Sequence, residues 1–234
     1  RSKSMRIENN SKKEIDKNFI EVIKLLKKNN ISYWLCHGTL LGIIRDNDLI
    51  PWDHDIDIAV WYKKNIKEIF KKIMIKENYK IKKKANDDLL TFIKKGGREI
   101  DINFYHQKIE NSKKIVYVKW FVPKNIFCNI INALSDANLY KGKFSFFINK
   151  LTLSSPFFVL IKKFLIKNNS FYKTIGYTQP AKLLEKFKEI EFKNTKVSVP
   201  VLSKKYLEYV YGLNWNKPKK NFNWYKDSPS VKKV

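Results

Sequence analysis

The feature that most constrains this chain is a short run in which acidic and apolar residues alternate. Asp53, Asp55 and Asp57 are separated by single residues, and the run 53–60 continues with Ile, Ala and Val. In a β-strand, side chains two positions apart point to the same face and lie about 6–7 Å apart. The run therefore predicts a strand with one buried apolar face and three carboxylates on the opposite face.

Three like charges on one strand face repel one another, and a bound cation would remove that repulsion. Carboxylate oxygens are hard ligands that suit Mg²⁺ or Mn²⁺, and these ions commonly complete their coordination with substrate phosphates. The alternative is a solvated acidic strand edge. We favour a metal site, because a chain with 48 Lys+Arg and 22 Asp+Glu concentrates carboxylates here between apolar neighbours.

A glycine turn lies upstream of this strand. His37-Gly38-Thr39 follows the strand-like run 33–36 and precedes a helix-like run, 40–45, that ends at Arg45. The free N–H groups at a helix N-terminus can hold a phosphate, and an arginine can add a bidentate contact. His37 is either a phosphate ligand or general acid, or a hydrogen-bonded structural residue, and Arg45 is otherwise a surface cation.

Two more residues are candidates for the same site. Asp101 lies on a strand-like run, 99–105, and its carboxylate reaches the other acids only if that strand neighbours the 53–60 strand. Trp52 precedes the acidic run. A tryptophan there either stacks on a nucleotide base or packs in the core or at its rim, and the same two alternatives apply to Trp34, Trp215 and Trp224.

Together these segments resemble the LicD/fukutin family. The family signature joins a Gly-Thr-Leu-Leu-Gly turn and a following arginine, here 38–45, to a Pro-Trp-Asp-x-Asp-Ile-Asp strand, here 51–57. Residues 98–105 and the closing segment 195–218, with its Tyr-Gly-x-x-Trp pattern, also resemble the family. Two departures are His54, where the family often has another Asp, and the stretch 106–175, which resembles nothing in it.

The resemblance implies an α+β fold, because the family is similar to DNA polymerase beta-type nucleotidyltransferases. It implies a mixed β-sheet flanked by helices, with an appended helical region. We expect a catalytic core at 1–125, a helical region facing the acceptor or a membrane at 126–175, and a closing segment that packs on the core at 176–234.

The resemblance also implies a reaction and the residues that carry it. The family moves a phospho-substituent, phosphocholine or a polyol phosphate, from a CDP-activated donor to a hydroxyl of a cell-surface or lipid-linked glycan and releases CMP. By this resemblance the catalytic and metal-holding residues are Asp55, Asp57 and Asp101. The expected substrate-binding residues are His37, Gly38, Thr39, Arg45, Asp53 and Trp52. The rival readings are a template-free nucleotidyltransferase acting on RNA or a small substrate, and a non-enzymatic basic membrane-binding domain.

The net charge of +26 indicates an anionic partner or, alternatively, compositional drift in a chain rich in Lys, Ile and Asn. Nucleic acid is the weaker candidate, because there is no arginine-rich tail and no aromatic-glycine RNA motif. The phenylalanine-rich segment 144–166 is flanked by lysines, which predicts docking on an anionic membrane. The alternative is that these phenylalanines form the core of the helical region.

Cysteine usage and hydropathy bear on the compartment. Cys36 and Cys128 lie in apolar stretches without paired neighbours, so neither a disulfide framework nor a zinc site is expected. The polar residues 1–13 lack the apolar core of a signal peptide, and no apolar run reaches the ~18 residues of a membrane span. We expect a cytoplasmic protein with peripheral attachment to the inner face of the membrane.

Overall fold

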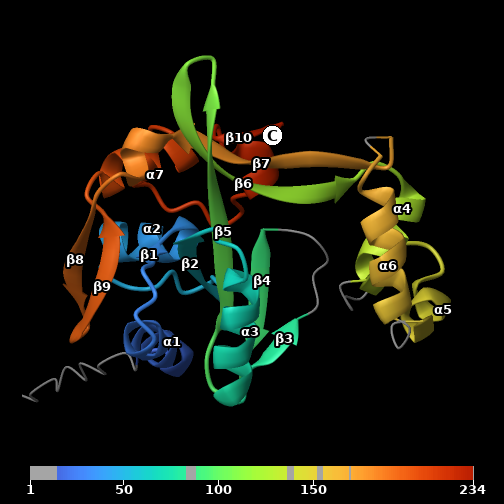
Figure 1. Cartoon of the computed structure of the whole chain (residues 1–234), viewed down its shortest axis with the longest axis horizontal. Helices are drawn as coiled ribbons and strands as arrows, with labels where there is room; N and C mark the ends of the chain where they lie inside the picture. The colour runs from blue at the N-terminus through green and yellow to red at the C-terminus, as the bar shows by residue number, and fades with distance from the viewer. Residues whose placement is uncertain (1–14, 83–87, 136–139, 152–154, 169, 234) are drawn as a thin grey trace, which may run out of the picture.

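The computed structural model describes residues 15–82, 88–135, 140–151, 155–168 and 170–233. Over these residues the chain forms a mixed β-sheet with helices packed around it, as Figure 1 shows, and the expected α+β class is confirmed. The helices are α1 (Lys17–Lys28), α2 (His37–Asp46), α3 (Ile66–Lys76), α4 (Ile126–Ser135), α5 (Ser145–Lys150), α6 (Ser155–Leu165), α7 (Ser203–Tyr211) and α8 (Trp224–Asp227).

Among the described residues the main sheet has eight strands. Its central path runs in the order β1 (Trp34–Leu35), β2 (Asp55–Trp61), β5 (Glu99–Glu110), β6 (Lys113–Pro123), β7 (Tyr172–Pro180) and β10 (Val231–Lys233). Off this path, β4 (Leu89–Ile93) pairs with β5 and with β3 (Lys80–Lys82). A separate hairpin joins β8 (Phe187–Phe192) and β9 (Thr195–Pro200).

Helix α1 illustrates how the sequence pattern produces the packing. Its apolar residues recur at helical spacing, and Phe19, Val22 and Ile23 are fully covered by the core. The Asp16 carboxylate accepts a hydrogen bond from the Phe19 N–H, which caps the helix and starts it at Lys17. The same carboxylate accepts from the Arg98 N–H at 2.9 Å, so the cap also ties α1 to the start of β5.

The pairing of β2 with β5 positions the acidic residues. These strands are parallel, and the register sets Asp57 directly opposite Asp101. The strand carrying Asp101 therefore neighbours the Asp53–Val60 run, as the sequence prediction required. On the other side of β5, β4 is antiparallel and places Thr91 opposite Asp101.

Strand β5 continues well beyond the expected 99–105. Its first half pairs with β2 and β4, and its second half, from His106 to Glu110, pairs with β6. The β5–β6 turn consists of Asn111 and Ser112, both with positive φ, which matches the twist that two-residue hairpins require. The sequence analysis identified neither β6 nor β7, the strands that extend the sheet from this turn.

The expected helical region is present as α4, α5 and α6. Figure 1 shows the three helices clustered beyond the ends of β6 and β7, away from α1. Helices α4 and α6 share a small core with the start of β7, in which Cys128, Ile131, Leu165 and Tyr172 are buried together. Both cysteines of the chain, Cys36 and Cys128, are buried and free.

Near the C-terminus the sequence pattern predicts a helix at 180–187 and a helix capped by Ser203, and both predictions were wrong. Ser203 does not cap α7, because it is the first residue of that helix and its hydroxyl bonds the Pro200 carbonyl. The helix expected at 180–187 is a short 3₁₀ turn, Ala181–Leu184, which leads into β8. For Trp34 the structure decides between the two alternatives in favour of packing, since it is 1% exposed and stacks on Phe187 inside the core.

Within the described ranges, none of the helices is long and apolar enough to cross a membrane.

Candidate functional site

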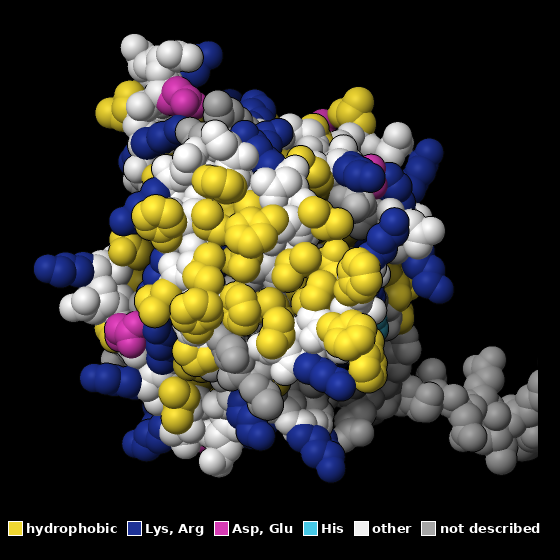
Figure 2. Space-filling model, turned by 90° about the vertical axis from the view of Figure 1, so that its right-hand side faces the viewer, with side chains coloured by type: hydrophobic (Ala, Val, Ile, Leu, Met, Phe, Trp, Pro, Cys, Tyr) yellow, Lys and Arg dark blue, Asp and Glu magenta, His cyan; other side chains and the backbone are white. Residues whose placement is uncertain are grey.

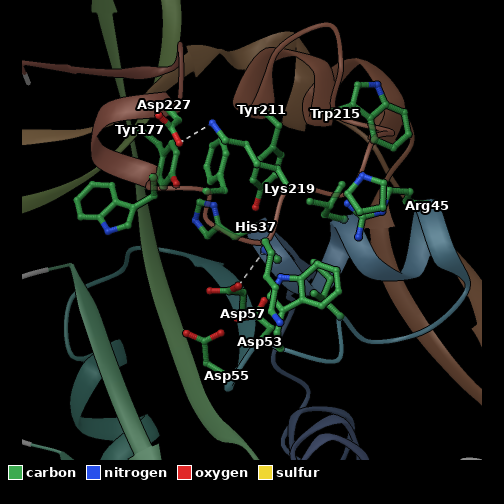
Figure 3. Close-up of a pocket in the computed structure, with 18 of the residues that line it drawn as sticks. His37, Arg45, Asp53, Asp55, Asp57, Tyr177, Tyr211, Trp215, Lys219 and Asp227 are labelled. Atoms are coloured by element: carbon green, nitrogen blue, oxygen red, sulfur yellow. Dashed lines mark hydrogen bonds and ion pairs between the residues drawn. The ribbon is translucent and has the colours of Figure 1, made fainter.

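A single open pocket of about 890 Å³ collects most of the predicted site residues. Its floor is formed by the start of α2 and by β2 and β5, and its roof by β7, the end of α7 and the segment 214–227. Figure 3 shows the carboxylates on one side of this space and the roof residues, among them Tyr177, Tyr211 and Lys219, on the other. Every residue predicted for the site lines the pocket except Thr39, which lies just beneath it.

The floor holds a tight cluster of acids. Asp53, Asp55 and Asp57 each offer a carboxylate oxygen, and these oxygens all lie within 4.8 Å of one another. Asp55 and Asp57 extend from the same face of β2, and Asp53 reaches the cluster from the loop before that strand. The alternating pattern thus does bring the three side chains together, and their spacing allows them to share a cation.

The environment of Asp57 disfavours its charge. Burial raises the pKa of Asp57 well above its usual range, and the neighbouring carboxylates of Asp55, Asp53 and Asp101 raise it further. The Gly38 N–H acts in the opposite direction, because it donates to the Asp57 Oδ2 at 3.0 Å. The cluster is therefore repulsive without a compensating positive charge.

The Gly38-Thr39 turn holds the acidic strand as well as facing the pocket. The Thr39 hydroxyl is buried and accepts a hydrogen bond from the Asp57 N–H at 2.8 Å. The Gly38 N–H also donates to the Asp57 side chain. The first turn of α2 thus makes hydrogen bonds to both the backbone and the carboxylate of Asp57. The predicted phosphate-binding turn thus fixes the position of the carboxylate beside it.

Gly38 is required for this close approach. A Cβ at position 38 would lie 2.1 Å from the Asp53 Oδ2 and 3.5 Å from the Asp57 Oδ2. No side chain larger than hydrogen fits unless the Asp53 carboxylate moves. Gly42 has a similar role at the far end of the motif, where a Cβ would meet the Asp48 carbonyl at 2.6 Å.

Asp101 faces the same pocket from the neighbouring strand. Its carboxylate accepts a hydrogen bond from the Thr91 hydroxyl, which comes from β4 on the opposite side of β5. It lies near enough to Asp57 to raise the pKa of that group. The structure therefore brings Asp101 to the floor beside the tight cluster of the other three acids.

His37 is buried beneath the roof. Its ring packs on Tyr177 with centroids 4.4 Å apart, and its Nε2 lies 3.1 Å from the Tyr105 hydroxyl. Burial lowers the pKa of His37 to about 3, so the imidazole is neutral near pH 7. This arrangement favours the structural interpretation over a general acid, and His37 positions the start of α2.

Arg45 and Trp52 lie at the edge of the pocket. The Arg45 guanidinium makes a bidentate pair with Asp46, at 2.8 Å through Nε and 2.6 Å through Nη2. Its side chain is only 6% exposed, so it is held in place rather than free on the surface. Trp52 is 36% exposed and lines the pocket.

The roof is the part that the sequence analysis mostly missed. Lys217, Lys219 and Lys220 line it, and Lys219 forms an ion pair with Asp227 at 2.8 Å. The pairing with Lys219, together with the Asn223 N–H, lowers the pKa of Asp227. The available signal was the run Asn-Lys-Pro-Lys-Lys at 216–220, directly after the closing Tyr-Gly-x-x-Trp pattern.

Aromatic rings form the other part of the roof. Trp120, Tyr177 and Trp224 contact one another, with ring centroids 5.1–6.0 Å apart, and all three line the pocket. Trp120 and Tyr177 lie on β6 and β7, the strands that sequence reasoning did not identify. The pocket thus combines an acidic floor with a roof of lysines and aromatic rings.

Comparison with known proteins agrees with this geometry. Residues 30–127 match the family described as LicD/FKTN/FKRP, nucleotidyltransferase domain. The ribitol-5-phosphate transferase FKTN of Homo sapiens is 24% identical over 211 residues, which cover 89% of this chain and 34% of that protein. An uncharacterized protein of Rickettsia typhi is 33% identical over 121 residues, covering 50% of this chain and 36% of that one.

Among solved structures, the lincosamide antibiotic adenylyltransferase LnuA aligns with a TM-score of 0.34 and 15% identity, over 60% of this chain and 98% of that one. The chain spans about a third of the length of the curated relatives FKTN and the Rickettsia typhi protein.

Proposed function

Because residues 30–127 form a nucleotidyltransferase domain of the LicD/FKTN/FKRP family, we propose that this protein is a metal-dependent phosphotransferase. In this proposal it moves a phospho-substituent from a CDP-activated donor to a hydroxyl of a glycan or lipid-linked glycan, and CMP leaves. The observation that carries the proposal is a single pocket in which clustered carboxylates face a roof of lysines and aromatic rings. Such a pocket suits a substrate that has a diphosphate and a base.

The floor fits a divalent cation. Its donors are all carboxylate oxygens, and Asp53, Asp55 and Asp57 lie close enough to share an ion. Burial and the neighbouring carboxylates both raise the pKa of Asp57, and a bound cation would relieve the repulsion between these carboxylates. Asp55, Asp57 and Asp101 would hold Mg²⁺ or Mn²⁺, with Asp53 as a further ligand. The ion would supply charge neutralisation at the diphosphate and the leaving phosphate.

The chain's own groups would bind and orient the donor. Lys217, Lys219 and Lys220 on the roof can neutralise phosphate oxygens that point away from the floor. The exposed faces of Trp52 and Trp224 can stack on a cytosine ring, since a base offers an apolar face to an aromatic side chain. In this proposal Asp101, which pairs with Asp57 across β2 and β5, would accept the proton of the acceptor hydroxyl.

The division of labour along the chain follows from this arrangement. Residues 1–125 would form the catalytic core, and 176–234 would close the pocket, since Tyr177, Tyr211 and the segment 214–227 supply its roof. Residues 126–175 include the helices α4 to α6, which contribute nothing to the lining of the pocket. This region is free to contact the acceptor or the surface that carries it.

The donor can be identified by release of CMP. Purified protein is incubated with CDP-ribitol, CDP-glycerol or CDP-choline and Mg²⁺ or Mn²⁺, with water accepting the phospho-substituent in the absence of a glycan, and CMP is measured by chromatography. Ribitol is tested first, because relatives of this chain are named ribitol-5-phosphate transferases. We expect metal-dependent CMP release from one of these donors, and its loss in Asp57→Asn but not in Glu185→Gln, an exposed acid outside the pocket.

Two results would contradict the proposal. Release of pyrophosphate from nucleoside triphosphates, without turnover of any CDP-alcohol, would favour a template-free nucleotidyltransferase. Absence of Mn²⁺ binding by the wild-type protein in calorimetry would favour a non-enzymatic basic domain, because the carboxylate cluster would then have no cation to hold.

A further inference from the structure

The helical region carries a large apolar surface that nothing in the described chain covers. Figure 2 shows hydrophobic side chains gathered over much of this end of the molecule, with lysines and arginines around them. We call this the apolar face and define it by six residues, each 62–76% exposed: Phe144, Phe146, Phe147, Phe157, Leu160 and Phe164. Patches of exposed large apolar side chains mark interaction sites.

Helix α6 shows why this surface is more than the outer side of a core. Its inward residues Ile161 and Leu165 pack in the small core of the helical region. Its outward residues Phe157, Leu160 and Phe164 also recur at helical spacing, yet each is at least 62% exposed. A surface helix normally has one apolar stripe that packs on the core and one polar face toward water. A helix that is apolar on both sides is expected to have a second apolar partner on its outer side.

Every charged side chain that the structure describes between residues 126 and 172 is a lysine. The sequence from Ile126 to Tyr172 contains six lysines and a single acidic residue, Asp136, which lies outside the described residues. Lys143, Lys150, Lys163 and Lys167 are exposed beside the phenylalanines, and the Lys150 ammonium lies 4.3 Å from the centre of the Phe146 ring.

Lys162 does not belong to this set. It was expected among the flanking cations, but it is fully buried in the structure. Its place in α6 turns it away from the surface on which Lys163 and Phe164 are exposed.

We propose that the apolar face docks the protein on an anionic membrane surface. Protruding aromatic side chains enter the boundary between headgroups and acyl chains, while lysines at the rim meet the anionic headgroups. A second copy of the chain is the less suitable occupant, because a symmetric contact would bring two lysine rims together. The proposal goes beyond the proposed function and does not depend on it, since binding is measured without a donor or turnover.

The test is flotation with two kinds of vesicle. Wild-type protein is mixed with vesicles of phosphatidylcholine alone or with 30% phosphatidylglycerol, at low and high salt, and the protein that floats is quantified. We expect binding to the anionic vesicles that weakens as salt rises. Two double variants probe the two components: Phe157→Ser with Phe164→Ser, and Lys163→Glu with Lys167→Glu. Each should lower the partition coefficient at least about tenfold.

Two control variants make the same change in net charge or in exposed apolar side chains as the test variants, but outside the apolar face. Lys24→Glu with Lys28→Glu reverses two exposed lysines at the same spacing on α1, far from the helical region. Ile75→Ser with Ile109→Ser removes two exposed apolar side chains, 55% and 79% exposed, outside it. Both controls should bind the vesicles within about twofold to threefold of wild type. In the proposal, binding depends on the apolar face and its lysines, and not on the total charge or total apolar surface of the protein.

Three outcomes would overturn the proposal. The first is equal recovery of wild type with neutral and anionic vesicles, and the second is loss of binding in the α1 control equal to that in Lys163→Glu with Lys167→Glu. The third is a concentration-dependent dimer in light scattering that Phe157→Ser with Phe164→Ser abolishes, which would assign the face to a second copy.

Discussion

Replacing Gly38 by alanine should distort the acidic floor through one atom. The new Cβ would lie 2.1 Å from the Asp53 Oδ2, whereas ordinary contact begins near 3.4 Å, so that oxygen must move by about 1.3 Å. Because this oxygen is the end of a flexible side chain, the clash can be relieved by turning Asp53 away from its rotamer, which costs about 0.5–1.5 kcal/mol. Since the displaced oxygen belongs to the carboxylate cluster, we also expect about a 10–100-fold loss of Mn²⁺ affinity, as is usual when the support of a metal ligand is disturbed.

A double-mutant cycle isolates this cause. In an Asp53→Ala background the clashing carboxylate is gone, and the nearest remaining atom to the new Cβ, the Asp57 Oδ2, is at an ordinary 3.5 Å. Gly38 has no positive φ, so alanine there should then stabilise the protein by about 0.4–1 kcal/mol through the unfolded state. Gly38→Ala should therefore be more favourable for the free energy of unfolding in the Asp53→Ala background than in wild type.

The assay is urea unfolding of the metal-free protein for all four members of the cycle, with Mn²⁺ titration by calorimetry for Gly38→Ala and wild type. The reasoning is refuted if the Gly38→Ala effect on the free energy of unfolding is the same in both backgrounds, or if Gly38→Ala binds Mn²⁺ as tightly as wild type.

Three further substitutions test neighbouring parts of the site. Asp57→Asn should reduce turnover to less than about a tenth of wild type yet melt no lower without metal, because it removes like-charge repulsion; calorimetry and CMP release measure the two effects. Thr39→Val should lose about 1–3 kcal/mol in urea unfolding, since the Asp57 N–H loses its acceptor, whereas Thr39→Ser should lose less. His37 takes up a proton near pH 3 when folded but near pH 6.5 when unfolded, so stability should fall as pH falls through this window. His37→Asn, which tolerates the positive φ, should remove about 2 kcal/mol of that fall between pH 8 and pH 5, and an unchanged pH profile would contradict the buried neutral imidazole.

Sequence reasoning located the floor because the floor is built from local patterns. The alternation at 53–60 and the helix-like run at 40–45 each depend on residues close together in the chain, and a strand and a helix formed there. The resemblance placed Asp101 beside them, and the parallel β2–β5 pair agrees with that placement. The roles of the individual site residues remain predictions.

The roof was harder to predict because its parts meet only in three dimensions. In β6 the lysines interrupt the apolar alternation, and the turn at Asn111-Ser112 lacks the glycine that usually marks a hairpin. Trp120 from that strand and Trp224 from the end of the chain touch through pairings that span more than a hundred residues. A short stretch of sequence cannot predict a contact between residues so far apart in the chain.

The course of β5 has a consequence for how the protein opens and closes. One half of this strand pairs with β2 and β4 beneath the floor, and the other half pairs with β6, which leads through β7 to the roof. A fluctuation that melts β5 would disconnect both walls at once, so floor and roof should unfold as one cooperative unit. Amide hydrogens in the middle of β5 should thus exchange with solvent only through the rarest openings, whereas those of α5 exchange through frequent local ones.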